Sequence, residues 1–427
     1  MKQIIAGAAL LAILGLACGR KDDAVELHDW NFGGKPRMIE WLRQRVNGFE
    51  TAHPGIRVVQ CQKSWNMIRE LLYAEFSVGT GPDVVNVHAN YAAEFGGAGY
   101  YYPLNTFPDF REVRTWYVPL LMESTRYREN YYGLPSSAIA FVLVCNRELF
   151  DREGISPPRT WSEFREAARR LTKDTDGDGT IDQYGLVLLG GDKGGFAYRL
   201  VPLLLKAGAD IMSDDLKTIR FNSPAAVSAV KLIADMYQTD HSITPGFLAY
   251  TLTEINDLFC SNKVAMSIEG PWFRGMVDDK NPGKKIYTVP VPVPDDRIAV
   301  YDSAPTLQDM VMYSINARTK HPEQAWELIK YLRNEEADMA WIREDLGATA
   351  TTSRALESPE AKALPDLPVY VNELRHARPW PSHPSMIAIA SDIFTPYTQK
   401  AIVGELSPQD AMDQAARDAQ EMIEGKK

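Results

Sequence analysis

Two hydrophobic periods alternate along the chain. Short apolar runs rich in branched residues predict buried strands, and they lie at 84–87, 186–189, 264–268 and 311–316. Between them, longer segments carry apolar residues three and four positions apart, which predicts helices with one face against a core. The helix expected from Pro36 onward shows this stripe in Ile39, Leu42, Val46 and Phe49. Strands alternating with helices predict doubly wound α/β sheets, which bind ligands at the carboxyl ends of their strands.

Residues 131–185 hold the densest set of local signals. A turn with Gly133 and Pro135 opens the apolar run 139–144, which is too short for a helix and predicts a buried strand. Thr160, with Glu163 three residues later, predicts a capping box at the start of a helix. The order expected here is therefore turn, strand, helix, capped helix, acidic loop and strand.

Four motifs follow one another in this stretch. They are YGLP at 132–135, an apolar strand ending at Asn146, PP-x-TW-x-EF at 157–164 and YG at 184–185. In this order they resemble the extracellular solute-binding proteins of ABC importers, in the large sugar-binding family that includes maltose-binding protein. The segment NKVAMSIEGPW at 262–272 and the expected last helix at 407–423 extend the resemblance over nearly all of the mature chain.

The resemblance implies a two-lobe, periplasmic-binding-protein-like α/β fold with a cleft between the sheets and a multi-strand hinge. The chain length of 427 residues and the 45 % hydrophobic content agree with two lobes. Crossings are expected near 135–138, 303–307 and 347–350. The first lobe would then hold 24–136 plus 308–346, and the second 137–307 plus 347–427.

Sugars offer hydroxyl rims and apolar ring faces, so a sugar site needs aromatic platforms and planar polar side chains. By resemblance, Trp272 of the GPW motif is the firmest platform candidate, with a Trp packed between the lobes as the alternative. Trp30 and Asn31 are expected on the first strand-to-helix loop, and His88, Asn90 and Tyr91 after the third strand. The further candidates, with exposed or structural roles as alternatives, are Trp65, Ser136, Glu269, Asp302, Arg378 and Trp380.

The N-terminus predicts export. Lys2 precedes the apolar run 4–17, which is shorter than the roughly 20 residues that span a bilayer. Residues 1–17 are therefore expected to be a signal peptide, Cys18 the lipidated residue and 18–23 a tether to the membrane. The alternative is an ordinary signal peptide that contains a cysteine.

The loop 174–182 resembles the first nine positions of an EF-hand calcium loop. Its expected ligands are Asp174, Asp176, Asp178, the Thr180 carbonyl and Asp182. Gly185 stands where a bidentate Glu completes an EF-hand, so the alternatives are a structural Ca²⁺ site and a solvated acidic turn. No other cofactor is expected.

Other function classes find little support. A net charge of −10 without a basic stripe argues against nucleic acid as a partner. The chain has no G-x-S-x-G, Walker or H-E-x-x-H motif, so we do not expect an enzyme. It also has no C-x-x-C, and we expect Cys61, Cys145 and Cys260 to be small hydrophobic residues that are buried.

The expected function is therefore capture of a carbohydrate and its delivery to the transmembrane subunits of an ABC permease, by a monomer. Two alternatives stay open at this point. One is a secreted glycan-active hydrolase, because paired carboxylates are set by spatial position and not by sequence spacing. The other is a binding protein for a non-sugar solute such as a polyamine.

Overall fold

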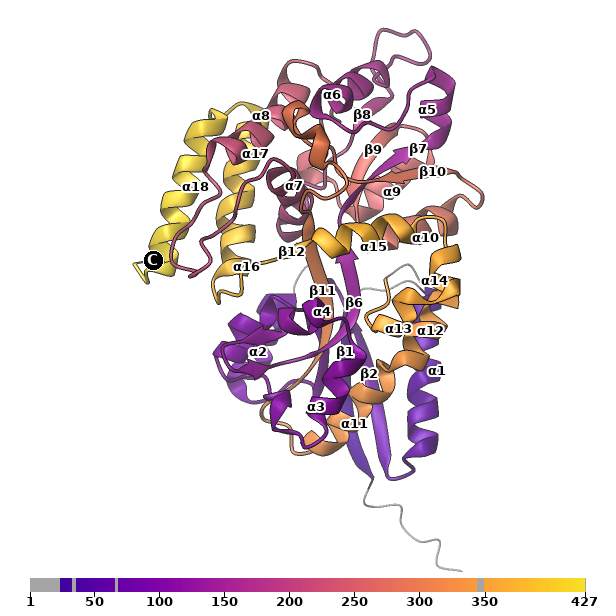
Figure 1. The fold of residues 1–427 in the computed structure, drawn as a ribbon, viewed down its shortest axis with the longest axis vertical. Helices are drawn as coiled ribbons and strands as arrows, with labels where there is room; N and C mark the ends of the chain where they lie inside the picture. Colours follow the sequence, from indigo (N-terminus) through magenta and orange to yellow (C-terminus); the bar gives the residue numbers. More distant parts are fainter. Residues whose placement is uncertain (1–23, 33–35, 66–67, 344–348, 427) are drawn as a thin grey trace, which may run out of the picture.

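The protein forms two lobes stacked along its long axis (Figure 1). The structure is a computed structural model, which describes residues 24–32, 36–65, 68–343 and 349–426. The expected signal peptide and tether at 1–23 lie outside the described residues. Among the described residues, no helix is long and apolar enough to cross a membrane. The predicted two-lobe α/β fold is confirmed.

The first lobe is built on a six-stranded sheet in the order β12-β11-β3-β1-β2, with β6 on β11. β1 runs parallel to β2 and β3, whereas β11 runs antiparallel to β3 and β6. The strands are β1 Val25–Phe32, β2 Ile56–Lys63, β3 Val84–His88, β6 Leu134–Ala140, β11 Leu307–Ile315 and β12 Arg378–Pro379, and the helices include α1 Pro36–Ala52, α2 Ile68–Val78, α11 Pro322–Leu332 and α12 Glu335–Arg343.

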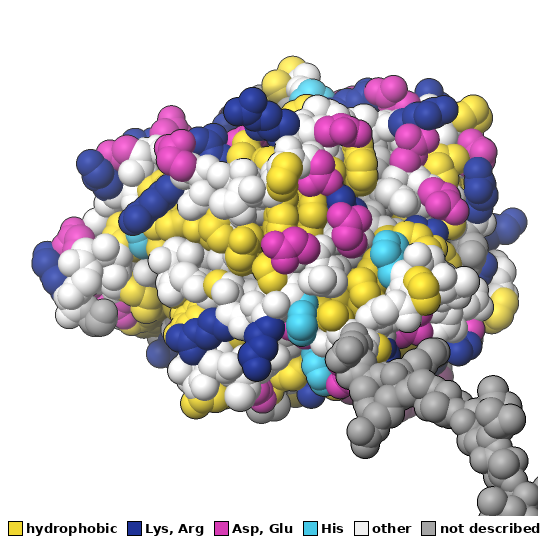
Figure 2. All heavy atoms as spheres, turned by 90° about the horizontal axis from the view of Figure 1, so that it is seen from below, with side chains coloured by type: hydrophobic (Ala, Val, Ile, Leu, Met, Phe, Trp, Pro, Cys, Tyr) yellow, Lys and Arg dark blue, Asp and Glu magenta, His cyan; other side chains and the backbone are white. Residues whose placement is uncertain are grey.

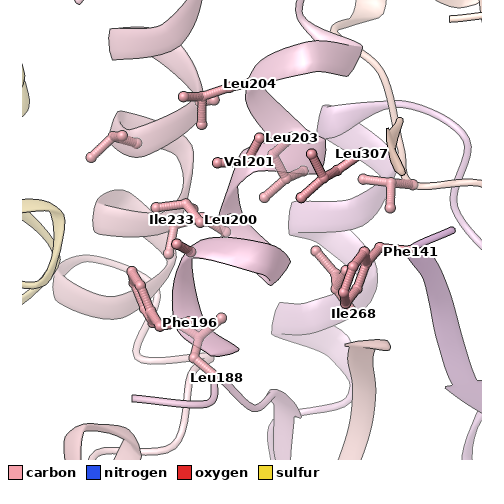
Figure 3. Packing of buried hydrophobic residues seen from close by; sticks show 14 of the residues in the cluster. Phe141, Leu188, Phe196, Leu200, Val201, Leu203, Leu204, Ile233, Ile268 and Leu307 are labelled. Carbon is pink, nitrogen blue, oxygen red and sulfur yellow. The ribbon is translucent and has the colours of Figure 1, made fainter. Parts of the chain in front are cut away.

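The second lobe is built on a four-stranded sheet in the order β10-β7-β9-β8. Its strands are β7 Val142–Asn146, β8 Tyr184–Leu186, β9 Val264–Glu269 and β10 Ile286–Val289, and its helices include α5 Arg147–Glu153, α6 Trp161–Arg170, α7 Lys193–Lys206, α8 Pro224–Gln238, α9 Leu252–Cys260 and α10 Trp272–Lys280. Figure 3 shows the apolar side of α7 in the core of this lobe, where Phe141 and Ile268 lie side by side.

Short elements complete the first lobe: α3 Phe110–Val113, α4 Pro119–Ser124, β4 Arg126–Tyr127 and β5 Asn130–Tyr131. The face at the lower end of the molecule shows Lys, Arg, Asp and Glu interspersed with apolar side chains (Figure 2). Among the described residues, this face therefore shows no continuous basic surface.

The apolar run 139–144, predicted as one strand, is two strands in two sheets. β6 pairs with β11 in the first lobe, Phe141 interrupts the pairing, and β7 pairs with β9 and β10 in the second. The first crossing therefore lies at Phe141. By strand pairing, residues 137–140 belong to the sheet of the first lobe, whereas the predicted boundary places them in the second.

The C-terminal segment is also divided differently from the prediction. Three alanines pack with Ile342 of α12. Ala350 lies just before α13 Ser353–Glu357, Ala355 lies in α13, and Ala361 lies in α14 Pro359–Ala363. α15 Leu367–His376 contacts both lobes: Leu374 packs in a core cluster of the first, whereas Tyr370 donates to the Gly270 carbonyl and Glu373 pairs with Lys206 in the second. After it, α16 Met386–Ala388, α17 Thr395–Val403 and α18 Pro408–Ile423 lie beside α7 and α8 of the second lobe (Figure 1).

Local sequence signals are confirmed at most positions, with two exceptions, Ile39 and Cys61. Thr160 and Glu163 form the predicted capping box. In α1, Leu42, Val46 and Phe49 are buried as predicted, but Ile39 is 38 % exposed and Trp41 takes its place in the core. Cys145 and Cys260 are buried thiols, whereas Cys61 is only half-buried.

The crossings are held together by buried polar contacts. The Thr306 hydroxyl donates to the Phe141 carbonyl at 3.0 Å, at the residue where the chain leaves the first sheet. Arg333 is 1 % exposed; it pairs with Asp338 at 2.7 Å and donates to the Ser136 carbonyl. Buried charges need such partners, and here the partners belong to separate passages of the chain.

Candidate functional site

Aromatic rings line the first lobe where β3 ends. The Trp65 ring lies 5.5 Å from the Phe32 ring and 4.6 Å from the His88 ring, measured between centroids. Asn90 follows two residues after His88, in the turn beyond the strand. Phe32 and His88 are the last residues of the parallel strands β1 and β3, and α/β sheets bind ligands at the carboxyl ends of such strands.

Tyr198 reaches this wall from α7 of the second lobe. Its ring stacks on His88 with centroids 5.4 Å apart and an interplanar angle of 22°, and its hydroxyl accepts a hydrogen bond from Asn90 Nδ2 at 3.0 Å. On its other sides Tyr198 contacts Phe141 at 5.9 Å and Trp380 edge-on at 5.3 Å. Tyr198 therefore connects the second lobe to this wall of the first.

Trp272 completes the second-lobe wall at the start of α10. Its ring lies 5.8 Å from Phe141 and edge-on to it. It also folds back over Gly270, where an added Cβ would come within 2.2 Å of the indole. We call Trp65, His88, Asn90, Phe141, Tyr198, Trp272 and Trp380 the interlobe cluster.

Two ion pairs border the interlobe cluster, and each is satisfied internally. Arg199 binds Glu269 with two hydrogen bonds of 3.1 and 2.5 Å, and the Ser267 hydroxyl adds a third to the same carboxylate at 2.8 Å. His88 Nδ1 lies 2.7 Å from Asp309 Oδ2. Burial by itself would lower the pKa of His88, but the charge and hydrogen bond of Asp309 raise it above its usual value.

Three buried polar atoms of the interlobe cluster have no hydrogen-bond partner among the described residues. They are the side-chain oxygen of Asn90 and the indole nitrogens of Trp272 and Trp380. A buried polar atom without a partner costs roughly 1–3 kcal/mol. Such atoms are therefore expected where a bound molecule supplies the partners.

Four predicted contacts lie outside the cluster and already have structural roles. Asn31 lies on β1 and not on a loop; it donates to Asp29 at 2.7 Å and accepts from the Tyr313 hydroxyl at 2.8 Å. The remaining three are Trp30 under the Lys63 ammonium, Tyr91 buried against Phe95, and Ser136 bound to Asn86.

Asp302 and Arg378 are exposed, and neither contacts the interlobe cluster. Asp302 lies 3.7 Å from Arg159, and its side chain is 74 % exposed. Arg378 pairs with Asp210 on the surface. Both positions therefore match the alternative of an exposed role that the sequence left open for them.

Sequence reasoning missed Tyr198, Phe141, Arg199 and Asp309. Two of them carry a signal that could have been used, because Arg199 and Asp309 each interrupt an otherwise apolar segment. A charge in such a segment requires a buried partner. Tyr198 and Phe141 carry no such signal, since an aromatic residue in an apolar helix or strand is ordinarily core.

The acidic loop connects α6 to β8. Ligand atoms of Asp174, Asp176 and Asp178 lie within 4.8 Å of one another. The backbone N–H groups of Gly177 and Gly179 donate to Asp174 at 2.7 and 2.8 Å, which lowers the pKa of that carboxyl. The Thr175 hydroxyl donates to Asp182 at 2.7 Å. The prediction of a calcium site stays a prediction.

Comparison with known proteins agrees with this architecture. The family model for bacterial extracellular solute-binding proteins matches residues 35–339. The galactooligosaccharide-binding protein of Bacillus subtilis is 25 % identical over 96 % of this chain and 94 % of its own length.

Two solved structures show the same fold. A solute-binding protein of Thermotoga lettingae bound with α-D-tagatose has a TM-score of 0.82 and 23 % identity, covering 94 % of this chain and 100 % of that one. A maltose/maltodextrin-binding domain of Bdellovibrio bacteriovorus bound to maltotriose has a TM-score of 0.80 and 24 % identity at the same coverage. Since the family model spans well over half of the sequence, the chain belongs to the bacterial extracellular solute-binding proteins.

Proposed function

We propose that the protein binds an uncharged sugar between its lobes and delivers it to the membrane subunits of an ABC importer. The observation that carries this proposal is the interlobe cluster, which combines aromatic rings from both lobes with three buried polar atoms that lack partners. A sugar hydroxyl both donates and accepts hydrogen bonds, so it suits the Asn90 oxygen and the two indole N–H groups alike. The rings suit the apolar faces of a pyranose or furanose.

The charges around the cluster favour a neutral ligand over a polyamine or an anion. Among the carboxylates around the rings, Glu269 is bound to Arg199, Asp309 is bound to His88, and Asp192 accepts the backbone N–H of Gly195. A polyamine would need free carboxylates, and an anion would need a free cation. The names of the similar proteins, which mention tagatose, maltotriose and galactooligosaccharide, support the same ligand class.

The same pairing disfavours the glycoside hydrolase alternative. Retaining and inverting glycosidases need one carboxylic acid that protonates the leaving group and one carboxylate that acts as nucleophile or base. Glu269 accepts three hydrogen bonds, and Asp309 is held by His88. We therefore expect binding without turnover.

Sugar binding is tested with a panel of mono- and oligosaccharides in a thermal-shift assay, followed by calorimetry and product analysis. We expect at least one sugar to raise the melting temperature without product. Trp272→Ala should weaken its binding by about tenfold or more, because one aromatic platform is lost. Trp116→Ala, a partly buried tryptophan outside the cluster, is the matched control. Unchanged sugar affinity in Trp272→Ala, or release of a hydrolysis product, would contradict the proposal.

We further propose that Cys18 carries a lipid anchor that holds the exported protein at the membrane. The support is the sequence alone: an apolar run too short to span a bilayer, followed by Ala17 and Cys18. In the native host, Cys18→Ser should move the protein from the membrane fraction to the soluble fraction. An unchanged distribution would contradict lipidation.

A further inference from the structure

His88 is held in place by a residue of the hinge strand. Its Nδ1 faces Asp309 Oδ2 at 2.7 Å, and Asp309 lies on β11, the strand paired with both β3 and β6. The Asp309 side chain is 3 % exposed, so its carboxylate has little water to bind in place of the imidazole. The rings of Trp65 and Tyr198 pack against the imidazole at 4.6 and 5.4 Å between centroids, and together with Asp309 they hold the orientation of His88.

The second ring nitrogen, Nε2, has no hydrogen-bond partner among the described residues, and the His88 side chain is 22 % exposed. Since Nδ1 faces the carboxylate, Nε2 lies on the ring edge away from Asp309, within the interlobe cluster. The titratable groups that act on His88 are Asp309 from β11 and Asp192 from the residue before α7. Tyr198 of α7 stacks on it, and the indole of Trp65 carries no charge.

We propose that His88, positioned by Asp309, donates a hydrogen bond from Nε2 to an oxygen of the bound sugar, so that binding is tighter at acidic than at alkaline pH. The inference rests on the proposed function and adds a residue that sets its pH dependence. In the imidazolium form both nitrogens donate, and a charged donor binds an oxygen more strongly than a neutral one. When the ring loses a proton, Asp309 retains the remaining one on Nδ1, and Nε2 can then only accept.

Calorimetry with the sugar identified in the panel tests this from pH 5.5 to 9. For the wild type we expect affinity to fall by about 3- to 10-fold as the pH rises through the titration of His88. Binding in buffers of different ionisation enthalpy should show proton uptake. His88→Asn should abolish both effects. Asp309→Asn should move the midpoint of the pH profile downward, because the carboxylate that favours the imidazolium is gone.

His241→Asn is the matched control, because His241 is exposed in a turn of the second lobe with a positive φ that Asn tolerates. It should keep the wild-type profile. Sugar binding with a flat pH profile in the wild type, or an unchanged profile in His88→Asn, overturns the role of His88 and leaves the proposed function standing. If no sugar binds the wild type, the proposed function itself fails and the role of His88 fails with it.

Discussion

Asp29 is a carboxyl group buried inside the first lobe, between β2 and β3. Burial raises its pKa to about 7, although hydrogen bonds from Asn31 and Gln60 oppose the rise. In the unfolded chain the same group has a pKa near 3.8. Between these two values the folded protein therefore binds more protons than the unfolded chain. Through this residue, the free energy of unfolding falls as the pH rises from about 4 to 7 and is level outside that window.

Asp29→Asn should remove that slope. We expect urea unfolding at pH 4.5 and 7.5 to differ less in the variant than in the wild type, by up to about 4 kcal/mol. Asp214→Asn, at an exposed position, serves as the control and should leave the slope unchanged. Equal slopes in Asp29→Asn and the wild type would show that Asp29 is ionised in the folded state at both pH values.

Gly270 is a second residue whose role depends on its surroundings. A Cβ at this position would come within 2.2 Å of the Trp272 indole, whereas one at Gly55 would meet nothing within 4 Å. Gly270→Ala should therefore displace the Trp272 ring and weaken sugar binding by about tenfold or more. Gly55→Ala should leave it unchanged. Wild-type affinity in Gly270→Ala would mean that the ring position is unimportant for binding.

At the scale of elements, one apolar run became β6 and β7. Both strands are buried, so the hydrophobic pattern alone predicts one continuous strand across Phe141. Strand pairing sets the break at Phe141, because β6 pairs with β11 in one sheet whereas β7 pairs with β9 and β10 in the other. The positions of the lobes, and of Phe141 in the interlobe cluster, follow from that choice.

The loop between α6 and β8 is the element whose function the fold leaves least explained. We expect Ca²⁺ to neutralise Asp174, Asp176 and Asp178 and to stabilise the second lobe. Adding EGTA should then lower the melting temperature more than it lowers sugar affinity. Asp176→Asn should be less sensitive to EGTA than the wild type. A melting temperature independent of Ca²⁺ would favour the solvated acidic turn, and a loss of affinity at constant stability would place the loop in the binding site.

At the scale of the whole molecule, the crossings depend on one buried carboxylate. Asp338 pairs with Arg333 and accepts the backbone N–H groups of Thr351 and Thr352, both at 2.7 Å. These contacts join α12 to the segment that leads into α13. The predicted crossing at 347–350 lies partly outside the described residues, and Thr349 bridges Ala138 of β6.

Asp338→Ala should destabilise the protein by about 3–5 kcal/mol, because it leaves the buried Arg333 charge without its carboxylate and two buried backbone donors without partners. Chemical denaturation measures this loss directly. Asp257→Ala removes a half-exposed surface partner of Lys280 and should cost less than about 1 kcal/mol. Similar losses in the two variants would argue against a special role for Asp338 at the crossings.

Sequence alone was enough to predict the fold class, most helices and strands, the capping box and five members of the interlobe cluster: Trp65, His88, Asn90, Trp272 and Trp380. The helices, strands and capping box follow from local periodicity and capping signals, whereas the two-lobe fold and the site residues follow from motifs that resemble a known family. Tertiary structure decided where one apolar run divides between two sheets, that Ile39 faces solvent, and that Asn31 and Ser136 bind protein groups. It also decided that Tyr198 and Asp309 meet His88. Each of these depends on contacts between residues far apart in sequence, which hydrophobic patterning does not encode.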